Sequence, residues 1–358
     1  MSEGVAGVQL GVARAGVKQQ GLDDVVVIAL APGTRTAALF TQNDFRAAPV
    51  ILALKHLAFS EALPSYLLIN TGNANAGTGE AGMAAALSCC ERLAALTETP
   101  AESVLPFSTG VIGEPLPSDL IAAALPAAID DLRQDNWRRA SGAILTTDTQ
   151  PKLRSLEVDL AGQSCRITGI AKGAGMVCPD MATMLSFVAT DAAIDADLLD
   201  ELLRAAVDAS LNRITVDGDT STNDAVTLSA TGQSGVKIEA GSTQADQFAD
   251  ALTTVMIQLA QDIVRDGEGA TKFVEIRVTG GESIEACDQV GRTIAHSPLV
   301  TTALFASAPN WGRILAAIGR AGLSNLDTDA VSIHINGVLI AEQGARAASY
   351  TEAQGQAA

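Results

Sequence analysis

Aromatic residues and positive charges are both scarce in this 358-residue chain. Aromatic residues make up only 3% of it, which argues against a surface that stacks nucleic-acid bases. Lysine and arginine number 23 against 41 acidic residues, so the net charge is −18. Most of such a surface repels phosphate backbones and anionic membranes. The composition therefore predicts neither a nucleic-acid partner nor a membrane partner.

Cysteine and histidine are too few and too scattered to indicate a metal centre. The 5 cysteines and 3 histidines form no CxxC pair and no HExxH motif, so we expect no metal and no bound cofactor. An odd number of unpaired cysteines is typical of reduced thiols. The chain start has no signal-peptide pattern, and no apolar run approaches the roughly 18 residues of a membrane span. We therefore expect a cytoplasmic protein.

Apolar residues, in contrast, are plentiful and follow a mixed pattern of strands and helices. They make up 47% of the chain, which is enough for a large core. The expected fold is a layered α/β (α+β) structure without a strict βαβ period, an internal repeat or a composition that marks a domain boundary. Strands are expected at 25–30, 36–41, 65–70, 154–170 around a turn, 273–278, and in a hairpin at 331–341. Helices are expected at 81–97, at 118–133 with Ser118 as N-cap, at 196–210 and 244–265, and from 310 onward.

Two glycine-rich loops have the composition of ligand-binding turns. The segment 77–82 matches G-x-G-x-x-G, but a polar run separates it from the preceding strand, and Glu80 would repel a pyrophosphate. A helix start is therefore favoured there over a nucleotide site. The turn at 108–113 could aim backbone N–H groups at an oxyanion, although turns of this composition are common.

The segment from Lys172 to Leu185 is the most unusual in the chain. A lysine stands among glycines, and Thr183 follows the small Ala182 where the sequence changes from polar to apolar. A self-cleaving N-terminal nucleophile has this arrangement: its hydroxyl attacks the preceding carbonyl, and hydrolysis of the resulting ester frees an amine that acts as a base. Residue types alone still favour an ordinary strand threonine, because Ala-Thr pairs are common and tuned catalytic groups are rare.

Several motifs, in one order along the chain, resemble those of the ornithine acetyltransferase (glutamate N-acetyltransferase) family. They are Asn70–Asn75, Ser108–Gly110, Lys172–Leu185, Leu211–Asp224, Asp266–Lys272, Ser297–Val300 and Asn310–Arg313. The resemblance covers nearly the whole chain. It implies an N-terminal-nucleophile-like fold in which an alpha chain, 1–182, and a beta chain, 183–358, interweave. It further implies a heterotetramer of two alpha and two beta chains.

The resemblance also implies residue roles and a reaction. Thr183 would be the nucleophile, freed by cleavage after Ala182, and Thr109 and Gly110 would form the oxyanion hole. The substrate-binding positions would be Thr146, Lys172, Thr183 and Glu268. Acetyl would pass from N-acetylornithine to Thr183 and then to glutamate, in arginine biosynthesis. Some members also use acetyl-CoA, as amino-acid N-acetyltransferases; the sequence leaves open whether this chain does, its oligomer size, and whether arginine inhibits it.

Two alternatives to the acetyltransferase remain at this point. One is a self-processing aminopeptidase or amidase, with water as the acceptor, and the other is a non-catalytic binder of acyl amino acids. Family members continue beyond the residue that matches Ala358 and bring a final Asn and a Ser or Thr to the substrate. We therefore expect either a fragment or a variant with a more open site. The mass of the protein and an assay with and without glutamate distinguish these cases.

Overall fold

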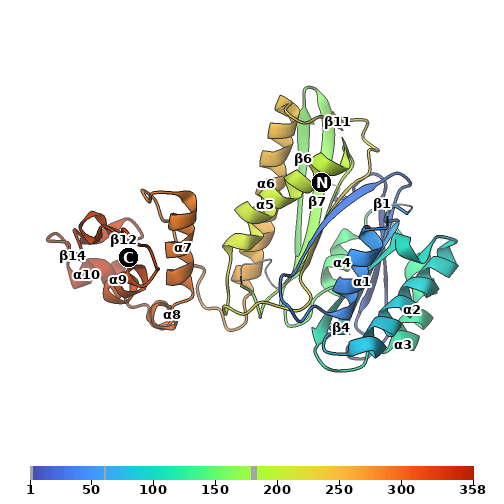
Figure 1. Ribbon diagram of the computed structural model, residues 1–358, viewed down its shortest axis with the longest axis horizontal. Helices are drawn as coiled ribbons and strands as arrows, with labels where there is room; N and C mark the ends of the chain where they lie inside the picture. Colours follow the sequence, from blue (N-terminus) through green and yellow to red (C-terminus); the bar gives the residue numbers. More distant parts are fainter. Residues whose placement is uncertain (1–2, 60–61, 179–183) are drawn as a thin grey trace. The chain divides into compact units, whose positions relative to one another are not determined.

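The computed structural model describes residues 3–59, 62–178 and 184–358. These residues divide into two compact units, one ending at Glu268 and one running from Gly269 to Ala358 (Figure 1). Each unit has its own buried apolar clusters. No helix among the described residues is long and apolar enough to cross a membrane.

The first unit is built on two main sheets. One has four strands in the order β1-β2-β4-β5: β1 (Val8–Ala13), β2 (Val25–Leu30), β4 (Tyr66–Asn73) and β5 (Val104–Val111). The other has five strands in the order β3-β10-β8-β7-β6: β3 (Arg35–Phe40), β10 (Ala225–Ala230), β8 (Leu185–Thr190), β7 (Gln163–Lys172) and β6 (Lys152–Leu160). The short strands β9 (Ala193–Ile194) and β11 (Lys237–Ile238) form a separate pair.

The two main sheets pack against each other, and helices cover their outer faces. One apolar cluster joins the sheets, and in it the rings of Phe107 and Phe187 meet edge to face at 5.0 Å. Helices α2 (Gly79–Thr97) and α3 (Ser118–Asp130) cover the four-stranded sheet. Helices α5 (Ala196–Ala209) and α6 (Thr243–Arg265) cover the five-stranded one (Figure 1). Two shorter helices, α1 (Ala48–Leu57) and α4 (Trp137–Ala143), complete the unit. These α-β-β-α layers confirm the expected layered α/β fold.

The sequence of β2 shows why its strand is buried on both faces. Val26 and Ile28 belong to the cluster between the sheets, whereas Val25 and Val27 belong to the cluster under α2 and α3. Successive side chains of a strand point to opposite faces. An unbroken apolar run is therefore what a strand covered on both sides requires.

The second unit combines helices with a small sheet. The helices are α7 (Ile284–Ala295), α8 (Pro298–Phe305), α9 (Trp311–Gly319) and α10 (Glu352–Ala357), and the strands are β12 (Ile333–Ile335), β13 (Val338–Glu342) and β14 (Ala345–Arg346). The predicted hairpin is confirmed as the antiparallel pair β12–β13. The predicted strand at 273–278 is wrong, since these residues join no sheet. Ile276 and Val278 instead pack on the apolar cluster of this unit, so the alternation reflects one-sided burial without strand pairing.

The predicted limits of α3 also need correction. Ser118 is the first helical residue and Pro117 is the N-cap, so Ser118 does not cap the helix. The helix ends at Asp130, three residues before the predicted end. Beyond it, the Asp131 carboxylate accepts a hydrogen bond from the N–H of Val12 at 3.0 Å. This tertiary contact holds the chain away from the helical path and has no local sequence signal.

The five-stranded sheet draws strands from both sides of the predicted cleavage point. β3, β6 and β7 precede residue 182, whereas β8 and β10 follow residue 183. β8 lies between β7 and β10, and β10 lies between β8 and β3. Two chains cut at this point would therefore share one sheet. Ala182 and Thr183 lie outside the described residues, so the cleavage and the division into 1–182 and 183–358 stay predictions.

Gly11 marks the closest approach of β1 to α3. A Cβ atom at Gly11 would lie 1.8 Å from the carbonyl oxygen of Ala128. We expect Gly11→Ala to lower the free energy of unfolding by about 1–3 kcal/mol through overpacking. Gly142→Ala is the matched control, because a Cβ there meets nothing within 4 Å and alanine favours the helix by up to about 1 kcal/mol. Urea unfolding measures both, and a Gly11→Ala protein as stable as the parent would contradict this packing.

Candidate active site

Lys172, the last residue of β7, contacts Thr109 near the end of β5. The ammonium Nζ donates a hydrogen bond to the hydroxyl Oγ1 of Thr109 at 3.1 Å. Both residues are buried, with 6% and 7% of their surface exposed. Burial lowers the pKa of the Lys172 ammonium, and the carboxylates of Asp148 and Asp224 oppose this shift. The fold thus brings two predicted site residues together from different sheets.

Thr109 and Gly110, the predicted oxyanion residues, are among the last residues of β5 that pair with β4, and they do not form a separate turn. Gly110 has φ +137°, and a Cβ atom there would lie 2.2 Å from the carbonyl carbon of Gly72 in β4. Only glycine fits this position. The ladder is irregular here, because Asn73 pairs with both Thr109 and Val111. Gly110 is exposed, so this peptide lies at the surface beside the buried ammonium.

Asp224 holds the residue that follows the predicted nucleophile in the sequence. Its Oδ1 accepts a hydrogen bond from the N–H of Met184 at 2.9 Å, and the residue is 1% exposed. Burial raises the pKa of this carboxyl well above its usual range, opposed by Met184, Lys172 and Ser221. Ser221 lies near the Asp224 carboxyl. The second oxygen of Asp224, Oδ2, has no hydrogen-bond partner among the residues the structure describes. Thr183 itself lies outside those residues, so its surroundings are defined here through Met184.

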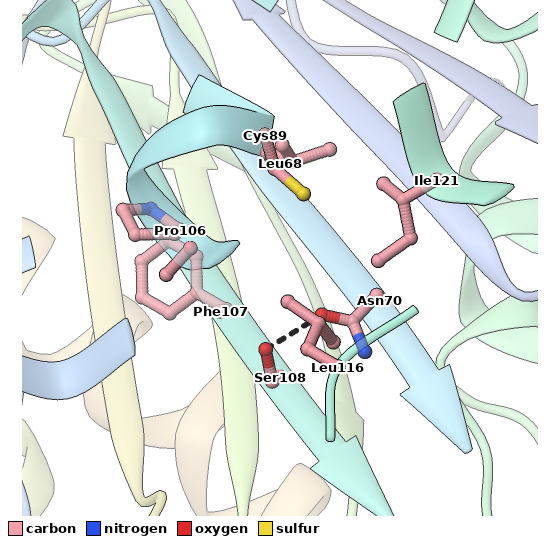
Figure 2. Close-up of a pocket in the computed structure, with 9 residues that line it drawn as sticks. Leu68, Asn70, Cys89, Pro106, Phe107, Ser108, Leu116 and Ile121 are labelled. Carbon is pink, nitrogen blue, oxygen red and sulfur yellow. Dashed lines mark hydrogen bonds between the residues drawn. The ribbon is translucent and has the colours of Figure 1, made fainter. Parts of the chain in front are cut away.

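Side-chain amides join the loops around Thr109. Asn223 Nδ2 donates to the carbonyl oxygens of Ala74 at 2.6 Å and Ser108 at 2.9 Å. The hydroxyl of Ser108 donates to Asn70 Oδ1 at 2.6 Å, as Figure 2 shows. Segments from three of the motifs that resemble the acetyltransferase family therefore meet here, and their amides act as structural ties.

The cavity in Figure 2 lies beside this network, between β4, β5, α2 and α3. Its volume is ≈ 10 Å³, and its walls are mainly apolar, including Leu68, Phe107 and Ile121. A volume of this size holds about one water molecule at most. Neither Thr109 nor Lys172 lines it, so it is a packing defect and not the substrate site.

A buried charge cluster fixes the loop that carries Thr146. Lys152 Nζ lies 2.7 Å from Asp148 Oδ1 and 2.7 Å from Asp266 Oδ2. Asp148 Oδ1 also accepts the N–H of Gly173 at 2.6 Å, and its Oδ2 accepts the N–H of Thr146 at 3.2 Å. Three segments are joined in this way: the Thr146 loop, the end of β7 next to Lys172, and the end of α6.

Sequence reasoning missed the three members of this cluster. Asp266 begins a motif that resembles the family, but the resemblance assigns it no role. Asp148 and Lys152 have the i, i+4 spacing of an ion pair, which is a frequent surface pattern. Nothing local indicates that both are buried, with 0% and 1% of their side chains exposed.

Glu268 lies over the glycines that follow Lys172. Its N–H donates to the carbonyl oxygen of Ala174 at 2.7 Å, and a Cβ atom at Gly175 would meet its Oε1 at 2.6 Å. Gly175 therefore leaves room for this carboxylate. The side chain is exposed, so the Glu268 carboxylate is accessible to a ligand.

Together these groups suit acyl transfer. A buried ammonium lies beside a hydroxyl and an exposed glycine peptide, which is an arrangement that stabilises a developing oxyanion. An exposed carboxylate on the adjoining segment can bind a cationic substrate group. Lys172 contacts Thr109, which precedes Gly110, and Thr146 and Glu268 are tied to Gly173 and Ala174, next to Lys172.

A family model and the curated relatives of this chain carry the same family name. A family model described as the ArgJ family matches residues 9–358. The arginine biosynthesis bifunctional protein ArgJ of Pseudomonas fluorescens is 53% identical over 99% of this chain and 87% of its own length. That of Methylococcus capsulatus is 54% identical over 98% and 86%. A solved structure of ornithine acetyltransferase complexed with ornithine, from Mycobacterium tuberculosis, is 29% identical, covers 50% of this chain and 94% of its own, and has a TM-score of 0.43.

The charge cluster generates a stability prediction. Lys152→Met leaves the Asp148 and Asp266 carboxylates buried without their shared partner, and we expect it to lower the free energy of unfolding by about 3–5 kcal/mol. Lys237→Met is the control, because Lys237 pairs with Glu239 at an exposed position and its loss should change stability by less than about 1 kcal/mol. Equal stability of the two variants would show that the cluster does not stabilise the fold.

The same cluster predicts a pH dependence. Burial raises the pKa of Asp148, but Lys172 and Lys152 outweigh it and hold that pKa below 3.8; Lys152 and Thr149 do the same for Asp266. The carboxylates of Asp148 and Asp266 therefore bind protons more readily in the unfolded chain than in the folded one. The stabilisation of the fold by these two ionised carboxylates is complete above pH about 4 and is lost as the pH falls through their folded-state pKa values. Unfolding measured between pH about 5 and 2.5 should show a shallower loss in Lys152→Met than in the parent.

Proposed function

This chain belongs to the ArgJ family, and we propose that it is an acetyltransferase of arginine biosynthesis that moves acetyl from N-acetylornithine to glutamate. The Pseudomonas fluorescens and Methylococcus capsulatus relatives are named as bifunctional, and we propose transfer from acetyl-CoA to glutamate as the second activity. The observation that carries the proposal is the buried Lys172 ammonium on Thr109, beside the exposed Gly110 peptide. Relatives more than half identical along almost the whole chain favour the transferase over the aminopeptidase, amidase and binder alternatives.

The proposed reaction has two steps at Thr183. Cleavage after Ala182 frees the Thr183 amine, which takes the hydroxyl proton as the hydroxyl oxygen attacks the acetyl carbonyl of N-acetylornithine. The bond from the acetyl carbon to the ornithine nitrogen breaks, and the proton passes to that nitrogen. The amine of glutamate then attacks the acetyl ester, forms N-acetylglutamate and restores the hydroxyl.

Lys172 would supply the electrostatic part of both steps. Each tetrahedral intermediate places a negative charge on the former carbonyl oxygen. The Lys172 ammonium is almost fully excluded from water, so its attraction to that oxygen is weakly screened. Thr109 Oγ1, which accepts from Lys172 Nζ, has its own proton left to donate. Gly110 would offer its peptide at the same edge of β5.

Substrate binding would use the groups tied to the Lys172–Gly175 segment. Glu268 would pair with the side-chain ammonium of ornithine, which matches its exposed carboxylate. Thr146 would contact the substrate from the loop that Asp148 holds. No cofactor is required, since the acetyl group travels on the substrates and on Thr183.

The shared sheet supports the association of the two proposed chains. Chains 1–182 and 183–358 would stay associated, because β8 and β10 of the second are hydrogen-bonded to β7 and β3 of the first. We propose that two such pairs form a heterotetramer in the cytoplasm.

Self-cleavage and transfer are both expected to need the Thr183 hydroxyl. The purified protein should give two bands of similar size on a denaturing gel, and the second should begin with Thr-Met-Leu-Ser-Phe. Thr183→Ala should abolish cleavage and transfer, while Thr183→Ser should keep part of each because a hydroxyl remains. N-terminal sequencing and an assay of N-acetylglutamate measure the two outcomes.

Thr190→Ser is the matched control for these substitutions, since it is the same change of residue type at the last residue of β8, which is not a predicted site residue. It should leave both bands and the transfer rate unchanged. Under native conditions the two pieces should elute together. A folded parent protein that stays as one intact chain would overturn the self-processing part of the proposal.

Glu268→Gln is expected to raise the KM for N-acetylornithine by about fivefold, the cost of an exposed ion pair. Cleavage should proceed normally, because Glu268 contacts the described part of the segment, 172–178, through its backbone N–H and through packing on Gly175. Steady-state kinetics with each substrate varied in turn provide the test. Kinetic constants equal to those of the parent would remove Glu268 from the site.

A further inference from the structure

Lys18 is a half-buried lysine that the proposed reaction does not use. The loop before β2 that carries it is held by Asp24, whose carboxylate accepts the N–H groups of Ala15 at 2.6 Å, Val17 at 2.7 Å and Lys18 at 3.1 Å. Asp24 is fully buried, and hydrogen bonds to a buried carboxylate are strong. The position of Lys18 is therefore set by the fold.

The stem of Lys18 lies against the glycines behind the proposed oxyanion site. A Cβ atom at Gly72 would lie 2.8 Å from Lys18 Cγ, and the positive φ of Gly72, +98°, also favours glycine. Gly72 pairs with Gly110 across β4 and β5. Neighbouring strands are about 4.8 Å apart, so the Lys18 stem lies against the strand next to the one that carries Gly110.

The Lys18 ammonium contacts segments that adjoin the predicted site residues. Its Nζ donates to the carbonyl oxygen of Ala143 at 3.0 Å, and the hydroxyl of Thr71 donates to that oxygen at 3.1 Å. Thr71 is the ladder partner of Thr109. Ala143 also ends α4, just before the loop that carries Thr146. The ammonium is thus placed between the oxyanion strand and the predicted substrate loop.

The charge of Lys18 is only partly compensated. Burial lowers the pKa of its ammonium to about 8, while Asp24 and Asp148 oppose that shift and Lys172 adds to it. The carboxylate of Asp24 is already engaged with three backbone N–H groups. An incoming carboxylate would therefore gain a charge-assisted hydrogen bond here.

The two proposed substrates would use the same site but carry opposite charges on their side chains. N-acetylornithine ends in an ammonium group and glutamate ends in a carboxylate. Glu268 suits the first, and Lys172 is engaged with Thr109 close to the reacting carbonyl. The side-chain carboxylate of glutamate needs a different cation, further from that carbonyl. Lys18, whose stem lies on Gly72, is suited to this role.

We propose that Lys18 binds the side-chain carboxylate of the acceptor glutamate and so determines the acceptor specificity of the second step. The inference rests on the proposed function, since it needs an acetylated Thr183 to which glutamate is the acceptor.

The test compares glutamate with glutamine, its neutral isostere, as acceptors. Lys18→Met removes the charge and keeps a stem on Gly72, Lys18→Arg keeps a charge, and Lys55→Met is the control at an exposed lysine of α1. Self-cleavage and the release of ornithine from N-acetylornithine report folding and the first step. We expect Lys18→Met to raise the KM for glutamate about tenfold, with the KM for glutamine, ornithine release and cleavage unchanged. Lys18→Arg should recover most of the preference for glutamate.

Other outcomes overturn the inference. Equal losses with glutamate and glutamine would mean that Lys18 only supports the fold, and an increased KM for N-acetylornithine would mean that it binds a group common to both substrates. A Lys18→Met protein that keeps the full preference for glutamate would exclude Lys18 from the site. A parent enzyme that cleaves itself but transfers acetyl to neither acceptor would overturn the proposed function as well.

Discussion

The burial of the Lys172 ammonium is the constraint on which the site depends. A cation removed from water is costly unless carboxylates compensate it, and Asp148 and Asp224 supply that compensation. Asp148 is in turn buried and requires Lys152, which requires Asp266 at the end of α6. The compensation of one buried charge thus extends from β7 through a loop to a helix, and it fixes the Thr146 loop on the way.

Simple rules of burial and alternation predict much of the fold from the sequence. The apolar runs at β2 and β8 and the Asn336-Gly337 hairpin appear where their patterns place them. The run at 273–278 has the same alternation but forms no strand, because pairing depends on a neighbour that a local pattern cannot specify. Motif resemblance predicts roles for Thr109, Gly110, Lys172, Thr146 and Glu268, which stay predictions, but it gives no role to Asp148, Lys18 or Asp224. The contacts of these three residues include partners distant in sequence, such as Gly173 for Asp148.

The shared sheet explains how a chain could be cut in its middle and stay folded. β7 ends at Lys172 and β8 begins at Leu185, so a cut between residues 182 and 183 falls in the connection and leaves both of these strands intact. The apolar cluster between the sheets contains side chains from both sides of the cut, including Phe107 and Phe187. Separation of the pieces would expose that cluster, which is unfavourable in proportion to the apolar area exposed.

The same geometry bears on the order of folding and the proposed cleavage. Thr109 comes from β5 and Lys172 from β7, in different sheets, and the anchor of Met184 comes from Asp224, just before β10. These groups meet only after the sheets have packed and β10 has joined β8. The edge-to-face contact of Phe107 and Phe187 lies two residues from Thr109 and three from Met184, so core packing sets the distance between the oxyanion strand and the start of β8. Self-cleavage that uses these groups would therefore have to follow folding, since the groups are assembled by the packing of the two sheets.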